Sequence, residues 1–297
     1  MGERGGGKAE STVDSAYFLK KNCGAELQAF DFWLFPFDLS LALPKTFPYM
    51  QDNRIVAMIP ARYAATRFPG KLMQMLGDKT IIRHTYDNTL ATGLFDQVVV
   101  VTDSDIIFEE ITSHGGNAIM SKKLHESGSD RIAEAAAHLD VDIVLNVQGD
   151  TPFVKKEPLQ KLLQVFEGEE GAKVQVASMM QPLIEQVYID DPNYVKVAVD
   201  LNMNAIFFSR SVIPYPRNKD LVIPYYEHIG VYAFRKQALL NFTNWPMTPL
   251  ESAEKVECLR YLEHGVPMKM VIVDYMGVEI DTPGDLDKAA SFMDNNE

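Results

Sequence analysis

Residues 54–71 read RIVAMIPARYAATRFPGK and join a short apolar run to a basic loop. The apolar run ends at Pro60, and the loop after it holds Arg62, Arg67 and Lys71. A buried strand that leads into a cationic loop suits a phosphate-rich ligand at the carboxyl edge of a parallel sheet. Fixed positive charge and exposed backbone N–H groups are what a triphosphate needs. The alternative is a basic loop that is simply solvated.

This loop differs from two well-known nucleotide-binding motifs. Gly70-Lys71 is followed by Leu72, where a Walker A loop has Ser or Thr, and the upstream glycine of that motif is missing. The chain also contains no G-x-G-x-x-G, so it lacks the dinucleotide fingerprint.

The composition is that of an ordinary globular protein with an acidic balance. The chain has 297 residues, of which 46% are hydrophobic and 23% charged, enough for one large α/β domain. Its net charge of −13 argues against non-specific binding to nucleic acid. Two distant cysteines, Cys23 and Cys258, predict neither a disulfide framework nor a zinc site, and they favour a reducing cytoplasm.

Residues 1–49 differ in composition from the rest. They begin Gly-rich and continue into the apolar stretch FDFWLFPFDLSLALP, which is interrupted by Asp31, Pro36 and Asp38. That stretch is too short and too interrupted for stable membrane insertion. We expect the folded part to begin near Met50, after a poorly ordered leader that is either an upstream extension or a start-site artefact. A leader that docks on the protein or touches a membrane is the alternative.

From residue 54 onward, strand and helix patterns alternate. Continuous apolar runs predict strands that are covered on both faces, and capping residues mark the starts of the helices between them. In this half the expected strands are 55–59, 97–102, 117–120 and 142–147, and the expected helices are 104–113, a helix to 138 capped by Ser129 or Asp130, and 157–166.

The second half is richer in strand patterns. Strands are expected at 174–180, 194–199, 205–208, 229–234 and 268–273, with a turn at 201–204 and helices at 250–264 and 284–293. Together these elements predict an α/β fold, a three-layer sandwich with a mixed, mainly parallel sheet. Residues 50–297 would form one domain, with a smaller β-rich element inserted around 175–235.

Two isolated carboxylates predict a site for a hard cation. Asp150 closes a Gln-Gly-Asp run at the end of an expected strand, and Asp281 lies just before the last expected helix. Mg²⁺ prefers one or two carboxylates together with substrate phosphates and water. The alternative for each is a turn or helix-capping role, and Asp281 stands only three residues before Gly284.

Two further groups of residues could contact substrates. The loop HESGSDR, residues 125–131, can present hydroxyls, amides and an arginine to a base or a phosphate, although Ser and Gly before a helix often only cap it. Polar side chains suited to an acidic, polyhydroxylated co-substrate, each of which could equally be structural, are Arg210, Arg217, His228, Tyr232 and Glu257.

Taken together, these segments resemble the CMP-Kdo synthetase (3-deoxy-manno-octulosonate cytidylyltransferase) family. The matching stretches follow the family's order and lie at 59–71, 91–103, 125–131, 146–152, 207–217, 228–234, 249–265 and 279–286. The resemblance implies a nucleotide-diphospho-sugar transferase-like fold with a dimerisation element, and a homodimer. It also implies the Mg²⁺-dependent reaction of CTP with Kdo to give CMP-Kdo and diphosphate, for lipopolysaccharide biosynthesis.

The same resemblance implies roles for individual residues. The catalytic set would be Arg62, Lys71 and Asp150, and the magnesium ligands would be Asp150 and Asp281. The nucleotide-binding set would be Ala61, Arg62, Lys71, Ser129, Arg131 and Gln148. The sugar-binding set would be Arg210, His228, Tyr232 and Glu257.

Three positions depart from the family pattern. Ala65 stands where the loop often has Ser, Thr151 replaces an acidic residue, and Cys258 occupies a position that is often Gln in the sugar pocket. Cys258 keeps open the alternative that the sugar is another nonulosonic acid, such as 8-amino-Kdo or a sialic-type sugar. A third alternative is a non-catalytic nucleotide-binding module.

Overall fold

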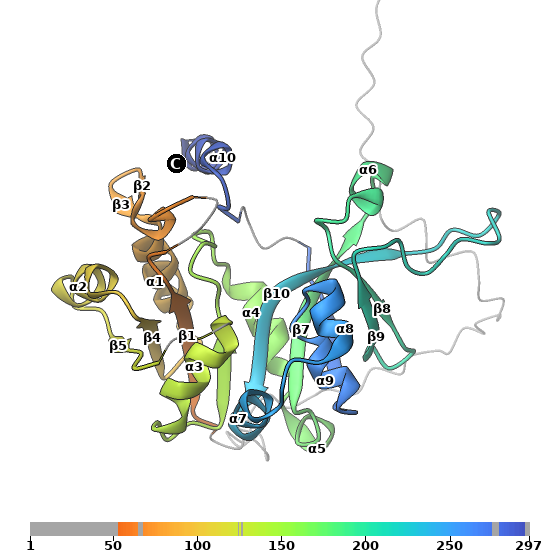
Figure 1. Ribbon diagram of the computed structural model, residues 1–297, viewed down its shortest axis with the longest axis horizontal. Coiled ribbons are helices and arrows are strands. Elements are labelled where there is room, and N and C mark those ends of the chain that lie inside the picture. The colour runs from red at the N-terminus through yellow and green to blue at the C-terminus, as the bar shows by residue number, and fades with distance from the viewer. Residues whose placement is uncertain (1–52, 65–67, 124, 126, 275–278, 295–297) are drawn as a thin grey trace, which may run out of the picture. The chain divides into compact units, whose positions relative to one another are not determined.

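The computed structural model describes residues 53–64, 68–123, 125, 127–274 and 279–294 (Figure 1). The chain divides into two units, 1–46 and 47–297, and every described residue belongs to the second. The expected leader, 1–49, and Ala65 and Arg67 of the basic loop lie outside the described residues.

One half of the central sheet consists of parallel strands. β1 (Ile55–Ala61) pairs with β4 (Gln97–Thr102) on one side and with β6 (Ile143–Asn146) on the other. β5 (Ala118–Met120) continues the sheet beyond β4. The sequences of these strands are continuous apolar runs, because both faces of a parallel sheet are covered.

The other half contains the antiparallel element. β10 (Tyr225–Arg235) runs antiparallel to both β6 and β7 (Val176–Leu183), and β11 (Met268–Ile272) lies parallel to β7. The strand order is therefore β11-β7-β10-β6-β1-β4-β5. The mixed, mainly parallel α/β sheet predicted from the sequence is confirmed.

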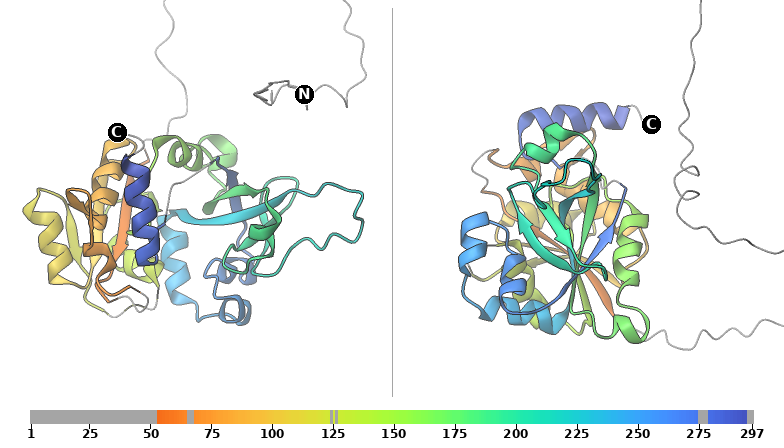
Figure 2. Two further views of the ribbon diagram at one scale, coloured as in Figure 1. Left: turned by 90° about the horizontal axis from the view of Figure 1, so that it is seen from above. Right: turned by 90° about the vertical axis from the view of Figure 1, so that its right-hand side faces the viewer.

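Helices cover both faces of this sheet (Figure 2). Along β4, Val98 and Val100 face one apolar cluster, while Val99 and Val101 face the other. The first cluster includes side chains of α1 (Ile81–Ala91), α2 (Asp105–Ser113), α4 (Lys156–Gln164) and α10 (Pro283–Asp294). The second includes α3 (Gly128–Ala137), α7 (Lys236–Asn244) and α9 (Leu259–Glu263).

The remaining elements are short. They are η2 (Lys71–Met73), β2 (Met75–Leu76), β3 (Lys79–Thr80), α5 (Gly168–Gly171), α6 (Gln186–Asp190), β8 (Lys196–Val199), β9 (Ala205–Ser209) and α8 (Pro249–Glu254). Within the described part of the chain, no helix has the length and hydropathy needed to cross a membrane.

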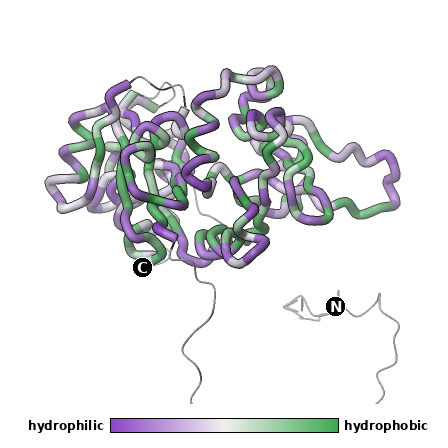
Figure 3. The backbone as a smooth tube through the Cα atoms, turned by 90° about the horizontal axis from the view of Figure 1, so that it is seen from below, coloured by the Kyte–Doolittle hydropathy of each residue, from purple (hydrophilic) through white to green (hydrophobic). Residues whose placement is uncertain are grey.

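The segment 175–235 shares both of its ends with the main sheet. β7 and β10 lie in the main strand order, and β8 and β9 join the same sheet as a side branch, since β8 pairs with β10 and β9 pairs with β8. The loop 211–224 extends from this branch (Figure 1). The loop carries hydrophilic and hydrophobic stretches (Figure 3), and its exposed apolar side chains include Tyr215 and Val222. A role of this segment in dimerisation stays a prediction.

Two helix predictions were wrong in detail. The expected helix 250–264 is interrupted, because Lys255 adopts a left-handed conformation with φ 55°, which ends α8 before α9 begins. The cap of α3 is Ser127, whose hydroxyl accepts a hydrogen bond from the amide of Asp130. Ser129 and Asp130 therefore lie inside the first turn of α3, not at its cap.

Candidate functional site

A cavity of about 310 Å³ opens where β1 and β6 end. Both strands are parallel neighbours, so the residues after them emerge at the same edge of the sheet. Residues from four separate parts of the sequence meet there. The predicted site residues that line the cavity are Ala61, Arg62, Lys71, Arg131, Gln148, Asp150 and Asp281.

Gly149 allows the end of β6 to approach the end of β1. A Cβ atom at this position would lie 3.1 Å from the carbonyl oxygen of Pro60 and 3.3 Å from Cδ1 of Ile82. Thr85 of α1 fixes the backbone further, because its hydroxyl donates to the carbonyl oxygen of Gly149 at 2.9 Å. Asp150 is thereby brought under the basic loop.

Lys71 lies between the two predicted metal-binding carboxylates. Its Nζ atom is 2.5 Å from Oδ2 of Asp150 and 2.9 Å from Oδ1 of Asp281. Burial alone would lower the pKa of Lys71, but the two carboxylates outweigh it and raise the pKa above its usual value. The ammonium group of Lys71 thus forms ion pairs with two carboxylates that are far apart in the sequence.

The helix-capping alternative for Asp281 is wrong. Thr282 and Asp285 cap α10 reciprocally: the amide of Thr282 donates to Oδ2 of Asp285 at 3.0 Å, and the amide of Asp285 donates to the Thr282 hydroxyl at 3.3 Å. The carboxylate of Asp281 points instead to Lys71. The segment of Asp281 is also joined to that of Asp150 through the backbone, because the amide of Ile280 donates to the carbonyl oxygen of Asp150 at 3.0 Å.

The donor set fits a magnesium ion. Oδ1 of Asp150 is buried and has no hydrogen-bond partner among the described residues, which leaves a hard oxygen available for a cation. Loss of hydration and the negative charges of Asp150 and Asp281 raise the pKa of Glu279 to about 7, although much of its side chain is exposed. Around Lys71 itself, two carboxylates face a single ammonium group, so an additional cation would be stabilised there.

Arg131 and Gln148 line the same cavity, and each side chain is fixed by a hydrogen bond to a neighbouring segment. Nη2 of Arg131 donates to Oδ2 of Asp103 at 2.9 Å, while its buried Nη1 finds no partner within the part of the chain that the structure describes. Nε2 of Gln148 donates to the carbonyl oxygen of Gly230 at 2.9 Å. Arg131 can therefore offer a donor to a phosphate or a base oxygen.

Three of the four predicted sugar-binding residues gather beside this cavity without lining it. The rings of His228 and Tyr232 are 5.4 Å apart. Burial lowers the pKa of His228 to about 3, so its ring is neutral at neutral pH. Burial also raises the pKa of Glu257 to about 7, although a hydrogen bond from Ser129 opposes this shift.

Two further predicted site residues, Ser129 and Arg210, do not line the cavity. Ser129, predicted to bind the nucleotide, donates its hydroxyl to Glu257 at 2.9 Å and is not among the residues that line the cavity. The guanidinium of Arg210 donates to the carbonyl oxygens of Glu254 at 2.7 Å and Pro192 at 2.9 Å. Arg210 therefore ties α8 to the loop before β8, away from the other three sugar candidates.

His125 also lines the cavity, although the sequence pattern predicted no role for it. Its Nε2 is 2.7 Å from Oε2 of Glu134, which also accepts from Ser121 and from the amide of Lys122. Burial alone would raise the pKa of Glu134, but these hydrogen bonds outweigh it and lower the pKa to about 2. A full negative charge on Glu134 therefore orients the imidazole of His125. The loop 125–131 was the available signal, because it was already identified as a ligand-facing loop.

The chain matches known proteins along most of its length. A family model described as cytidylyltransferase matches residues 56–272. A protein of Flavobacterium johnsoniae named 3-deoxy-manno-octulosonate cytidylyltransferase is 58% identical over 240 residues, which are 81% of this chain and 98% of that protein. A protein of the same name from Myxococcus xanthus is 40% identical, over 82% of this chain and 98% of that protein.

Solved structures agree with the sequence matches. A CMP:2-keto-3-deoxy-manno-octonic acid synthetase complexed with CTP superposes with a TM-score of 0.78 at 34% identity, over 82% of this chain and all of that one. A 4-diphosphocytidyl-2C-methyl-D-erythritol synthase from Anaerococcus prevotii, 18% identical, has a TM-score of 0.54 over 82% of this chain and 99% of that one, and shares the fold.

Proposed function

The chain belongs to the cytidylyltransferase family, and on that premise we propose that it transfers CMP from CTP to Kdo and releases diphosphate. Relatives that carry the name of this activity are up to 58% identical and are matched over nearly their whole length. The product, CMP-Kdo, would enter lipopolysaccharide biosynthesis. A homodimer in the cytoplasm is part of the same proposal.

The observation that carries this proposal is the position of Lys71. Its ammonium group sits between Asp150 and Asp281 in a cavity that Arg62 and Arg131 also line. A nucleoside triphosphate placed there would meet positive charge from three side chains. This matches what a transfer reaction at phosphorus needs, because positioning and charge stabilisation supply most of the rate.

In the proposed reaction the anomeric hydroxyl of Kdo attacks the α-phosphorus of CTP. A new oxygen–phosphorus bond forms, the bond to the β-phosphate oxygen breaks, and the hydroxyl proton is released as diphosphate leaves. Arg62 and Lys71 neutralise the charge that builds on the leaving group. Mg²⁺, held by Asp150 and Asp281 together with the substrate phosphates, would supply further positive charge at that place.

The remaining residues would bind and orient the two substrates. Arg131 donates from its buried Nη1, with its other nitrogen held by Asp103. His228, neutral and held by the hydroxyl of Ser178 at 3.0 Å, can exchange a hydrogen bond with a sugar hydroxyl. Because Glu257 contacts Ser129 at the start of α3, the sugar side and the nucleotide side are mechanically connected.

The test is diphosphate release from CTP with Kdo and Mg²⁺. We expect turnover by the unchanged protein, none after chelation of Mg²⁺, and a large loss in Asp150→Asn. The matched control is Asp87→Asn, a carboxylate on α1 that bonds Lys79 and Arg83 outside the cavity. CTP binding without diphosphate release would leave only a nucleotide-binding module.

The sugar is identified by a panel of acceptors. Kdo, 8-amino-Kdo and a sialic-type sugar are each compared by kcat/KM, with UTP as the alternative nucleotide. A polar pocket discriminates strongly between sugars that differ in one hydrogen-bonding group. A higher kcat/KM for an acceptor other than Kdo would retain the transferase and reject the sugar. Sedimentation velocity tests the dimer.

A further inference from the structure

The C-terminal helix α10 contacts or directly continues the three segments that carry Lys71, Asp150 and Asp281. We propose that α10 is a clip that holds Asp281 against Lys71 and Asp150, and that Phe292 is the positioning residue that anchors it. The inference rests on the proposed function for the identity of the ligands, CTP and a divalent cation. Its structural basis is independent of which sugar is used.

The first contact joins α10 to the segment of Asp150. The rings of Phe292 and Phe153 pack edge to face, with centroids 4.8 Å apart and planes inclined by 64°. Phe153 stands three residues after Asp150 and packs against the core beneath the sheet edge. Through this aromatic pair, the end of α10 is fixed to the loop that presents Asp150.

The second contact joins α10 to the segment of Lys71. α10 lies beside β2, which follows η2 and its first residue Lys71 (Figure 1). A Cβ atom on Gly77 would lie 3.3 Å from Cε of Met293, so the hairpin turn and the helix are in close contact. Ala289 is fully buried in the same apolar cluster that contains Leu72 and Leu76.

The third contact is covalent, because α10 begins immediately after Asp281. Thr282 and Asp285 cap the helix and thus fix where it starts. On the other side, Ile280 is fully buried and its amide bonds the carbonyl oxygen of Asp150. Asp281 is therefore held from both directions, by a buried residue before it and by a capped, anchored helix after it.

Such a clip answers an electrostatic problem. Asp150 and Asp281 repel each other, and Asp281 is the more exposed of the two, with 36% of its side chain accessible against 16%. Asp281 is also 210 residues from Lys71 in the sequence, so no local structure places it. An apolar anchor that does not depend on charge keeps the second carboxylate in place when Lys71 is drawn toward a triphosphate.

The experiment compares Phe292→Ala with the unchanged protein, using Mn²⁺ as the probe. Mn²⁺ binding to the protein is followed in the presence of CTP by the loss of the free-ion signal in electron paramagnetic resonance beyond the loss that CTP alone causes, and CTP binding is measured separately without metal. We expect Mn²⁺ affinity to fall roughly 10-fold to 100-fold, as for residues that orient metal ligands, while metal-free CTP affinity stays within about twofold.

Two further variants separate positioning from folding. Phe292→Leu keeps an apolar side chain at the anchor but loses the ring contact with Phe153, so its Mn²⁺ affinity is expected to fall measurably, though by less than that of Phe292→Ala. Lys288→Ala, on the exposed side of the same helix, serves as the matched control and is expected to bind Mn²⁺ normally. Circular dichroism melting of each variant reports whether the fold is kept, and the leucine variant gives the result if the alanine variant does not fold.

The inference would be overturned by unchanged Mn²⁺ affinity in Phe292→Ala, provided that Asp281→Asn lowers the affinity. If Phe292→Ala does not fold, unchanged affinity in Phe292→Leu has the same meaning. Equal losses of Mn²⁺ and metal-free CTP binding would do the same, because they indicate a general loss of packing. The inference and the proposed function fail separately. If the unchanged protein released no diphosphate with Kdo, the proposed function would fall, and a Phe292-dependent Mn²⁺ affinity would still support the clip.

Discussion

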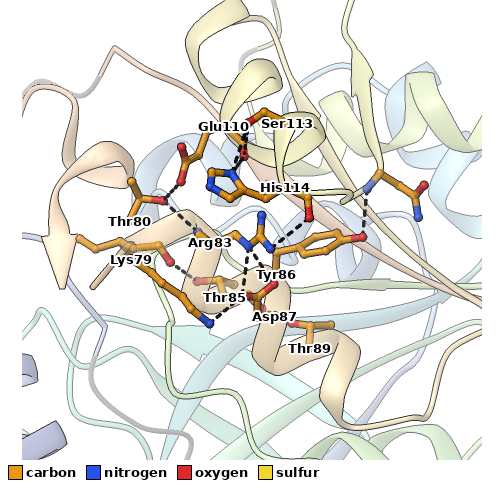
Figure 4. Close-up of polar contacts among 12 residues, drawn as sticks. Lys79, Thr80, Arg83, Thr85, Tyr86, Asp87, Thr89, Glu110, Ser113 and His114 are labelled. Atoms are coloured by element: carbon orange, nitrogen blue, oxygen red, sulfur yellow. Dashed lines mark hydrogen bonds and ion pairs between the residues drawn. The ribbon is translucent and has the colours of Figure 1, made fainter. Parts of the chain in front are cut away.

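Two clusters of charged residues in this protein have opposite composition. In the site cluster, Lys71 is one cation between two carboxylates, Asp150 and Asp281. In the α1 cluster, Asp87 is one carboxylate between two cations: it accepts from Arg83 at 2.9 and 3.0 Å and from Lys79 at 3.0 Å (Figure 4).

The difference shows how a structural cluster can be told from a functional one. Arg83 and Asp87 are one helical turn apart and Lys79 precedes the same helix, so the α1 cluster stabilises its own segment. The site cluster joins residues that are 79 and 210 positions apart, and one oxygen of Asp150 lacks a partner among the described residues. A buried carboxylate oxygen that lacks a hydrogen-bond partner costs folding free energy, and a ligand cation could satisfy it.

The largest expected difference between the two clusters is in their effect on activity. Lys71→Met should lower kcat/KM for diphosphate release by roughly 100-fold to 1,000-fold, because charge stabilisation of the leaving group is lost. Lys79→Met, the matched change in the α1 cluster, should leave kcat/KM within about twofold. Steady-state kinetics with CTP and Kdo check both. Equal losses in the two variants would mean that the clusters do not differ in function.

The next effect sharpens the comparison through pH. Burial raises the folded-state pKa of Glu257 from its ordinary value of 4.5 to about 7, so the folded protein binds this proton more tightly than the unfolded chain does. The free energy of unfolding should therefore fall as pH rises from about 4.5 to about 7, by a contribution on the order of 3 kcal/mol from this group. Glu257→Gln should remove that contribution and be relatively more stable at pH 8 than at pH 5.

Urea unfolding of both proteins at pH 5 and pH 8 measures the effect. His228 titrates in the opposite sense, because its lowered pKa costs stability below about 6.5, but it is present in both proteins and cancels in the difference. Glu109→Gln, an exposed change on α2, is the control. An equal pH dependence in the unchanged protein and Glu257→Gln would show that Glu257 is not held in its neutral form.

A smaller effect concerns the sign of two stability changes. Asp87→Asn should lower the free energy of unfolding by roughly 1–2 kcal/mol, because it weakens hydrogen bonds to two charged groups. Asp150→Asn without metal should be neutral or stabilising by up to about 1 kcal/mol, because it removes one of two neighbouring negative charges. Urea denaturation in chelator-treated buffer compares them. A strongly destabilised Asp150→Asn would make the site cluster structural.

The smallest effect is that of Lys79→Met on stability. The side chain of Lys79 is 41% exposed, so its pair with Asp87 is screened by water and should contribute no more than about 0.5 kcal/mol. The same urea experiment measures this change, with added salt reducing it further. A loss above 1 kcal/mol would show that the α1 cluster is more tightly coupled than its exposure suggests.

Much of the sheet could be predicted because parallel strands need continuous apolar runs. The strand 97–102 was predicted with the bounds that β4 has. Two of the longer helices, α1 and α7, were missed for physical reasons. α1 is rich in β-branched residues, Ile81, Ile82, Thr85 and Thr89, which are weak helix formers that burial stabilises here. α7 follows β10 directly, and Arg235 at its start makes no side-chain cap.

The candidate site was predicted less evenly than the sheet. Arg62, Lys71, Arg131, Gln148 and Asp150 meet in one cavity, because residues that follow parallel strands share an edge. Ser129 and Arg210 do not line this cavity, because a two-residue shift in the α3 cap or a carbonyl partner in a neighbouring segment redirects a side chain. Their roles in binding substrates stay predictions. Such choices are made by contacts that sequence spacing does not contain.

The sequence by itself determined the layered α/β class, the basic character of the loop at 60–71 and the two carboxylates, because apolar periodicity and residue chemistry are local properties. Only the tertiary structure decided that Asp281 faces Lys71 while Thr282 caps α10, and that α10 packs on the segments of both partners. The physical reason is distance along the chain: electrostatic and packing partners that lie 79 or 210 residues apart are chosen by the folded core.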